Sequence, residues 1–170
     1  PVLLKDLVGR IPNTSSFINR HGSLLGLVTA KWDQQLISVL TQFYDPLYHC
    51  FTFQDFQLVP TLEEFSYFLG IPVLDQTPFT GLEKTPRPEE VAAILPLTKE
   101  EVLANWETRS GVKGFLVKFL VGKANDFWND LDFKAYEDIL ALLIYGLVLF
   151  PNPDTFISIY AIRIFMSRNP

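Results

Sequence analysis

Apolar side chains recur at intervals of three and four residues in several segments of the chain, which is the spacing of one face of an α-helix. Between Asp33 and Tyr44 they share the segment with glutamine and serine, and Pro46 follows shortly after. A residue that precedes proline disfavours helical geometry, so the segment has a natural end. The pattern predicts an amphipathic helix over 33–44. From Ser15 to Ala30 the spacing is irregular and predicts no long helix.

The second half of the chain carries clear helix signals. Thr98 and Glu101 have the spacing of a capping box, in which each side chain bonds the backbone N–H of the other. Pro88 is followed by two acidic residues, which suits the start of a helix. The pattern predicts helices over 88–95, 98–106, 112–124 and 136–149.

The helix predicted over 136–149 is apolar on nearly every side, which places it at the centre of a core. After Asn152 a last segment extends through Phe165. Its spacing favours a helix, with a strand as the alternative because β-branched residues are frequent.

Two short runs of aromatic and β-branched residues, Tyr48–Phe53 and Phe56–Val59, lie on either side of a polar pair. They predict a small β-hairpin near residues 48–59. The predicted fold is therefore mainly α, a multi-helix domain with one small hairpin.

Two further signals organise the first half of the chain. Thr61 and Glu64 form another capping box, which opens a short helix. Residues 75–88 are rich in proline, threonine and glycine and predict a surface loop. We expect a single domain over 1–170, with 75–88 as a loop inside it.

Composition excludes several classes of protein. Of the 170 residues 48% are hydrophobic, and the longest apolar run, Ile139–Phe150, is much shorter than the roughly 20 residues that cross a bilayer. We therefore expect no membrane span. A net charge of −5 disfavours nucleic-acid binding, which needs a basic face. The best candidate for such a basic face is a group of basic residues interleaved with aromatic ones, and we interpret it as the solvated face of a helix. The group consists of Arg109, Lys113, Lys118 and Lys123, together with Phe115, Phe119 and Trp128.

Residues with catalytic potential are few and scattered. Neither His21 nor His49 has the spacing of a metal-ligand pair, and Cys50 is the single cysteine, so no disulfide can form within the chain. His49 and Cys50 are neighbours on a predicted strand, where they point to opposite faces. We interpret Cys50 as a buried or half-buried structural residue.

Two acidic groups have simple structural interpretations. In the first group, Asp45 falls at a helix end, Asp55 in a turn, and Glu63 and Glu64 at a helix start. The group of Asp126, Asp130, Asp132, Glu137 and Asp138 is typical of a solvated face. No glycine-rich phosphate loop is present. The sequence therefore predicts no catalytic, cofactor-binding or metal-binding residue.

Aromatic side chains gather around the predicted hairpin. We interpret most of this cluster as core, since buried rings contribute large contact areas. The alternative is an exposed docking surface. The candidate interaction surface consists of Phe43, Tyr44, Tyr48, Phe51, Phe53 and Phe56.

Several stretches of the chain resemble the plant mobile domain, in particular the legume, retrotransposon-associated branch that is catalogued as a domain of unknown function. They are Leu40–Pro46, Cys50–Phe65, Leu69–Pro72, Ala141–Asn152 and Phe165–Pro170. The resemblance covers nearly the whole chain and implies that it is the N-terminal part of a domain that continues past Pro170.

The resemblance also implies a biological setting. Members of this plant-specific family spread with transposable elements, and domesticated nuclear members act in transposon silencing beside a phosphatase-like protein. The family has no agreed catalytic residues. We therefore expect an intracellular, nuclear protein-interaction module without enzymatic activity. The alternatives are a nucleic-acid-binding module for element mobility or targeting, and an enzyme whose site is completed by residues beyond Pro170.

Overall fold

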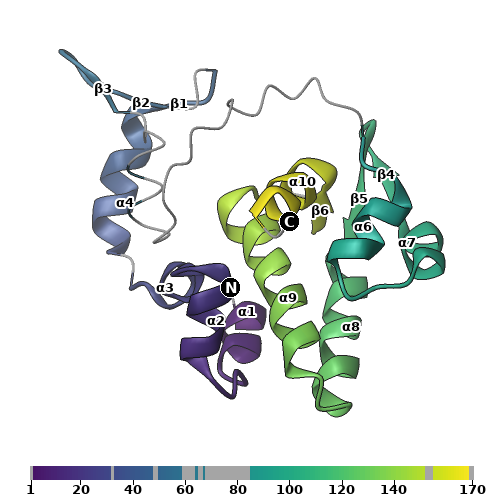
Figure 1. The fold of residues 1–170 in the computed structure, drawn as a ribbon. Helices are drawn as coiled ribbons and strands as arrows, with labels where there is room; N and C mark the ends of the chain where they lie inside the picture. The colour runs from purple at the N-terminus through teal and green to yellow at the C-terminus, as the bar shows by residue number, and fades with distance from the viewer. Residues whose placement is uncertain are drawn as a thin grey trace. The chain divides into compact units, whose positions relative to one another are not determined.

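The computed structural model describes residues 2–31, 33–47, 50–58, 64, 67, 85–151 and 155–168. The chain divides into two compact units, which we call the core unit (1–28 and 78–170) and the small unit (29–77). The described part is mainly α-helical and contains two small three-stranded antiparallel sheets (Figure 1). This confirms the predicted fold class.

Helices form most of the core unit, and α8 (Val117–Asn129) and α9 (Phe133–Ile144) lie side by side in it (Figure 1). A π-helical turn, Tyr145–Leu149, continues α9. The other helices of this unit are α1 (Val2–Val8), α2 (Thr14–His21), α3 (Leu24–Thr29), α6 (Pro88–Ile94), α7 (Lys99–Asn105) and α10 (Ile159–Arg168).

Helix α9 is the centre of the core unit. Every side chain from Ala135 to Ile144 is buried, as the apolar pattern predicts. The helix begins at Phe133, earlier than predicted, because the Asp132 carboxylate accepts a hydrogen bond from the Ala135 N–H at 3.0 Å. The Tyr136 hydroxyl donates to the Leu7 carbonyl oxygen at 2.5 Å, and burial raises the pKa of Tyr136 to about 12.

The helix predicted over 112–124 is wrong in its first five residues. Val112–Leu116 is strand β5, which pairs antiparallel with β4 (Glu107–Arg109), and α8 begins only at Val117. The two strands are joined by Ser110 and Gly111, which both have positive φ, at 50° and 80°. Two such residues make the tight turn that suits a β-hairpin, so the chain reverses here instead of entering a helix.

The last described segment combines the two predicted alternatives. Phe156–Ser158 forms β6, which pairs antiparallel with β5, and α10 begins at the next residue. The Ser158 hydroxyl accepts a hydrogen bond from the Ala161 N–H at 3.4 Å and so caps α10. The predicted helix and the alternative strand are therefore each correct for part of this segment.

The helices predicted at 88–95 and 98–106 are confirmed as α6 and α7. The Thr98 capping box is present, with the Thr98 hydroxyl 3.1 Å from the Glu101 nitrogen and the Glu101 carboxylate 2.8 Å from the Thr98 nitrogen. Glu101 also binds the Lys123 ammonium group at 2.8 Å, which ties α7 to α8.

Up to residue 58, the described part of the small unit contains a short helix followed by a sheet. The predicted hairpin near 48–59 is confirmed in its described residues, where β2 pairs antiparallel with β3. The helix predicted over 33–44 ends early, because residues 41–43 tighten into a 3₁₀ turn and Tyr44 begins a strand. The elements are α4 (Gln34–Leu40), β1 (Tyr44–Asp45), β2 (Cys50–Thr52) and β3 (Gln57–Leu58), with β2 at the centre of the sheet.

Two predictions fall largely outside the described residues. Of the capping box at Thr61, only Glu64 is described, and it is helical, as is Tyr67. Of the loop predicted over 75–88, the structure describes only the last residues, and Pro88 already begins α6. The expectation of a single domain over 1–170 stays a prediction.

Strand pairing in the core unit requires a glycine at position 114. A Cβ atom there would overlap the backbone carbonyl oxygen of Ile157 on β6. Gly114→Ala should therefore lower the free energy of unfolding by about 1–3 kcal/mol, the usual cost of an overpacked site. The measurement is urea denaturation followed by circular dichroism.

Gly122→Ala is the matched control. Gly122 lies within α8 and a Cβ atom there would meet nothing within 4 Å. Alanine should stabilise the protein by up to about 1 kcal/mol, because glycine is a poor helix former. Equal unfolding midpoints for the two variants would contradict the packing of β5 against β6.

Candidate functional site

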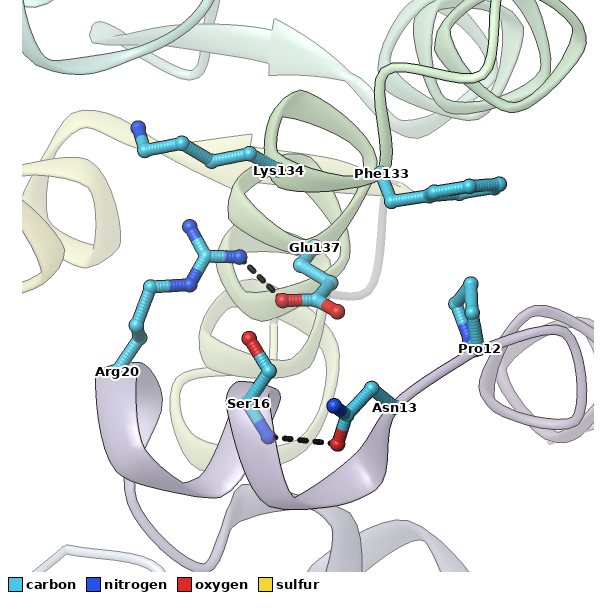
Figure 2. Close-up of a pocket in the computed structure, with 7 residues that line it drawn as sticks. All are labelled: Pro12, Asn13, Ser16, Arg20, Phe133, Lys134 and Glu137. Carbon is cyan, nitrogen blue, oxygen red and sulfur yellow. Dashed lines mark hydrogen bonds and ion pairs between the residues drawn. The ribbon is translucent and has the colours of Figure 1, made fainter.

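Charged side chains and one histidine converge where α2 faces α9, at a group that we call the ion cluster: Arg20, His21, Lys134, Glu137 and Asp138. Arg20 bridges the two carboxylates, pairing with Glu137 and donating to Asp138 Oδ1 at 2.9 Å. Figure 2 shows Arg20 of α2 and Glu137 of α9 pointing toward one another. Lys134 Nζ lies 3.3 Å from Asp138 Oδ2 at the exposed edge.

His21 is the most enclosed member of the ion cluster, with 2% of its side chain exposed. Its ring lies between Phe17 and Phe165, at centroid distances of 4.9 and 6.1 Å. Nε2 is 3.1 Å from Asp138 Oδ1, but the contact lacks the geometry of a hydrogen bond.

The charge of Asp138 is fixed by two opposing effects. Burial by itself would raise the pKa of this carboxyl group. The polar contact with His21 and the positive charges of Arg20 and Lys134 outweigh burial, so the pKa of Asp138 lies below its ordinary value. Asp138 is thus a carboxylate at neutral pH and forms an ion pair with Arg20.

Two open hollows adjoin the ion cluster, and Arg20 and Lys134 line both. The first, about 350 Å³, is bordered by Asn13, Ser16 and Phe133 (Figure 2). The second, about 380 Å³, reaches past Asp138 toward α6 and α10. Arg20 already engages both carboxylates, so the groups beside the hollows bind one another. The arrangement joins α2 to α9, and His21 Nε2 beside the second hollow is buried without a hydrogen bond.

The ion cluster corrects one interpretation of the sequence. Asp126, Asp130 and Asp132 are exposed, as a solvated acidic face requires, but Glu137 and Asp138 are buried, at 3% and 9% exposure. Their partner Arg20 is more than a hundred residues away in the chain, so no local pattern identifies them. Within the described ranges, no group of three or more histidine, cysteine or acidic residues is arranged to hold a metal ion.

The other residues considered for chemistry lie apart from this site. Cys50 is buried on β2, with its sulfur 3.6 Å from the Thr52 hydroxyl oxygen, in agreement with a structural role. Asp45 accepts a hydrogen bond from the Leu47 N–H at 2.8 Å, and Asp55 is exposed between β2 and β3. His49 and Glu63 lie outside the described residues.

The group of basic residues around α8 does not form a single free surface. Lys123 is engaged by Glu101 and lies 4.8 Å above the ring centroid of Phe127. Arg109 on β4 is 3.3 Å from Glu107. Lys113 and Lys118 are exposed, but Phe115, which we expected between them, is fully buried.

The structure places five of the six residues of the candidate interaction surface in two groups of touching rings. Phe53 stacks on Phe43 and on Phe56, with centroid distances of 4.8 and 4.7 Å. Tyr44 and Phe51 meet edge to face at 5.5 Å. We call these residues the aromatic surface: Phe43, Tyr44, Phe51, Phe53 and Phe56. The sixth, Tyr48, lies outside the described residues.

The rings of the aromatic surface pack on one another without being enclosed. Phe43, Tyr44 and Phe56 are 40%, 43% and 60% exposed. Among the described residues of the small unit, Cys50 alone is a buried apolar residue. Further exposed apolar side chains of this unit are Leu36, Val39, Leu47, Leu58 and Tyr67. The interpretation of the cluster as core is therefore correct in that the rings contact one another, but Phe43, Tyr44 and Phe56 are not buried.

The acidic charge of the protein is concentrated in the same unit. Residues 29–77 contain one basic residue, Lys31, and six acidic residues, whereas the core unit contains thirteen of each. The net charge of −5 thus belongs entirely to the small unit. From Trp32 to Glu83 the sequence contains no lysine or arginine. The uneven distribution of charge between the two units can be counted from the sequence, but it cannot be seen in the net charge of the whole chain.

The fold defines a mainly α-helical protein in which an ion cluster with two buried carboxylates joins α2 to α9. The chain belongs to the family described as Domain of unknown function (DUF7745), whose model matches residues 4–170. No curated protein and no solved structure matches the chain. In the described part of the structure, no helix is long and apolar enough to span a membrane.

Removing the charge of Asp138 should weaken the core unit. Asp138→Asn should lower the free energy of unfolding by about 1.5–3 kcal/mol, the range for hydrogen bonds to charged groups. Because the folded-state pKa is lowered, the carboxylate contributes this stability above its unfolded-state pKa of about 3.9. The contribution is lost as the pH falls through the lower folded-state pKa, so the two proteins should converge in acid.

The measurement is urea denaturation of both proteins at neutral pH and at acidic pH. Asp126→Asn, at an exposed carboxylate of α8, is the control and should change stability by less than about 0.5 kcal/mol. A difference between wild type and Asp138→Asn that stays constant into acid would show that the loss is steric rather than electrostatic.

Proposed function

We propose that this protein is a non-catalytic protein-interaction module that binds its partner through the aromatic surface of the small unit. The observation that supports this function is the exposed stack of Phe43, Phe53 and Phe56. Exposed apolar side chains that gather on one small unit are typical of a binding surface rather than of an ordinary solvated one.

The stack is suited to binding because its rings already hold one another in place. Phe53 is sandwiched between two neighbours, so little side-chain freedom remains to be lost when a partner covers it. Aromatic side chains that enter a partner's pocket commonly dominate the energy of an interface. Leu47 and Leu58, which are 77% and 50% exposed, add apolar area in the same unit.

The resemblance to the plant mobile domain gives this proposal a setting. We propose a plant protein derived from a transposable element, which acts inside the nucleus and pairs with a phosphatase-like protein. The alternatives have less support. A nucleic-acid-binding module needs unengaged basic side chains, and Lys123 and Arg109 already contact acidic groups. An enzyme needs a reactive group, and the acids beside the two hollows are engaged by Arg20.

Site-specific photo-crosslinking tests the proposed function. Benzoylphenylalanine replaces Phe56, whose side chain is exposed and whose ring lies at the end of the stack. After irradiation in a legume nuclear extract, we expect a discrete protein adduct, because a partner that covers the stack places its atoms against this ring. The adduct is identified by mass spectrometry.

Tyr160 is the matched control position. It is an aromatic residue of α10 in the core unit with a similar exposed fraction, 46%. Benzoylphenylalanine at Tyr160 should not yield the adduct seen at position 56. The proposal fails if both positions give the same products, or if position 56 gives none.

A further inference from the structure

We propose that the partner of the aromatic surface is a lysine- and arginine-rich polypeptide segment that also carries apolar anchor residues. This inference rests on the proposed function and specifies the chemistry of its partner. It follows from two features that coincide in the small unit: an exposed aromatic stack and all of the net negative charge.

Acidic residues outnumber basic residues in the small unit. Lys31 is its single basic residue, against six acidic residues. Asp55 is exposed in the turn between β2 and β3, directly between Phe53 and Phe56 in sequence. Negative charge therefore lies immediately beside the stack, where it attracts a basic partner and accelerates encounter with it.

The stack determines the rest of the partner's chemistry. A partner with basic groups alone would leave part of the apolar area of Leu47, Phe56 and Leu58 in water. Lysine and arginine can cover some of it, because their stems are apolar and their cations bind favourably to aromatic faces. Apolar anchors complete the contact. The complementary segment is therefore both basic and apolar.

The same charge argues against the other occupants of such a surface. Two small units that met face to face would bring together two charges of −5, so a second copy of this face is a poor partner. Nucleic-acid phosphates and anionic lipid headgroups carry the same sign as the small unit and are repelled. A basic polypeptide is the class of macromolecule that fits both features.

Synthetic peptides of one length and one pattern of leucine and phenylalanine test this inference with the whole chain. The remaining positions are lysine and arginine in the basic peptide, serine and glutamine in the neutral peptide, and glutamate in the acidic peptide. Fluorescence anisotropy should show the basic peptide binding at least about tenfold more tightly than the neutral one, with a gap that narrows at high ionic strength. A basic peptide with serine at the apolar positions should bind more weakly than the basic peptide that retains them.

Substitutions at three exposed positions locate the binding. Asp55→Lys should weaken binding of the basic peptide by roughly three- to tenfold, because it reverses a charge beside the stack. Asp126→Lys makes the same change in net charge on α8 of the core unit and should leave binding unchanged. Phe56→Ser, at a side chain that is 60% exposed, should weaken binding of both the basic and the neutral peptide. Circular dichroism confirms that each variant is folded.

Each result bears on one proposal or the other. If the neutral peptide binds as tightly as the basic one and Phe56→Ser abolishes both, the aromatic surface binds proteins but the inferred partner chemistry is wrong. If Asp55→Lys and Asp126→Lys weaken binding equally, the attraction is general and the inference is overturned. If no peptide binds, the inference is also overturned, and crosslinking at position 56 decides the proposed function independently.

Discussion

A helix that is buried on every side must bury its polar residues as well, and this constraint organises the core unit. Glu137 and Asp138 of helix α9 are buried together with the apolar side chains of the same helix. Ionised groups in such a position destabilise a fold unless they are paired, and Arg20 of α2 pairs with both. Arg20 thus links α2 to α9 beside the buried ring of Phe17, and the Tyr136 hydroxyl links α1 to the same helix.

The two units use their aromatic residues in different ways. In the core unit Phe17, Phe115 and Phe156 are fully enclosed by helices and by the sheet. The small unit has fewer than half as many residues, and a chain of that size encloses a smaller fraction of its surface. Its rings stack on one another and keep one side in water. This difference supports a structural role for the first unit and a binding role for the second.

Local signals in the sequence predicted local structure well. The Thr98 capping box and the buried helix around Ile139 were recognisable because all of their interactions lie within a few residues. Strand β5 was missed because its pairing with β6 joins segments that are about forty residues apart, although Ser110 and Gly111 marked the turn before it. The ion cluster was missed for the same reason, since Arg20 and Glu137 meet only in the folded chain.

The acidic residues of this protein consequently serve two purposes that the overall charge does not distinguish. In the core unit they are balanced one for one by basic residues, and the acids of the ion cluster are buried beside their partners. Buried pairs are only weakly screened by salt. The small unit contains six acidic residues and one lysine. Asp55 is exposed to solvent, where salt screens charges strongly. Ionic strength should therefore act on the proposed partner binding by the small unit while leaving the core unit largely unaffected, so folding and the proposed recognition depend on separate sets of charges.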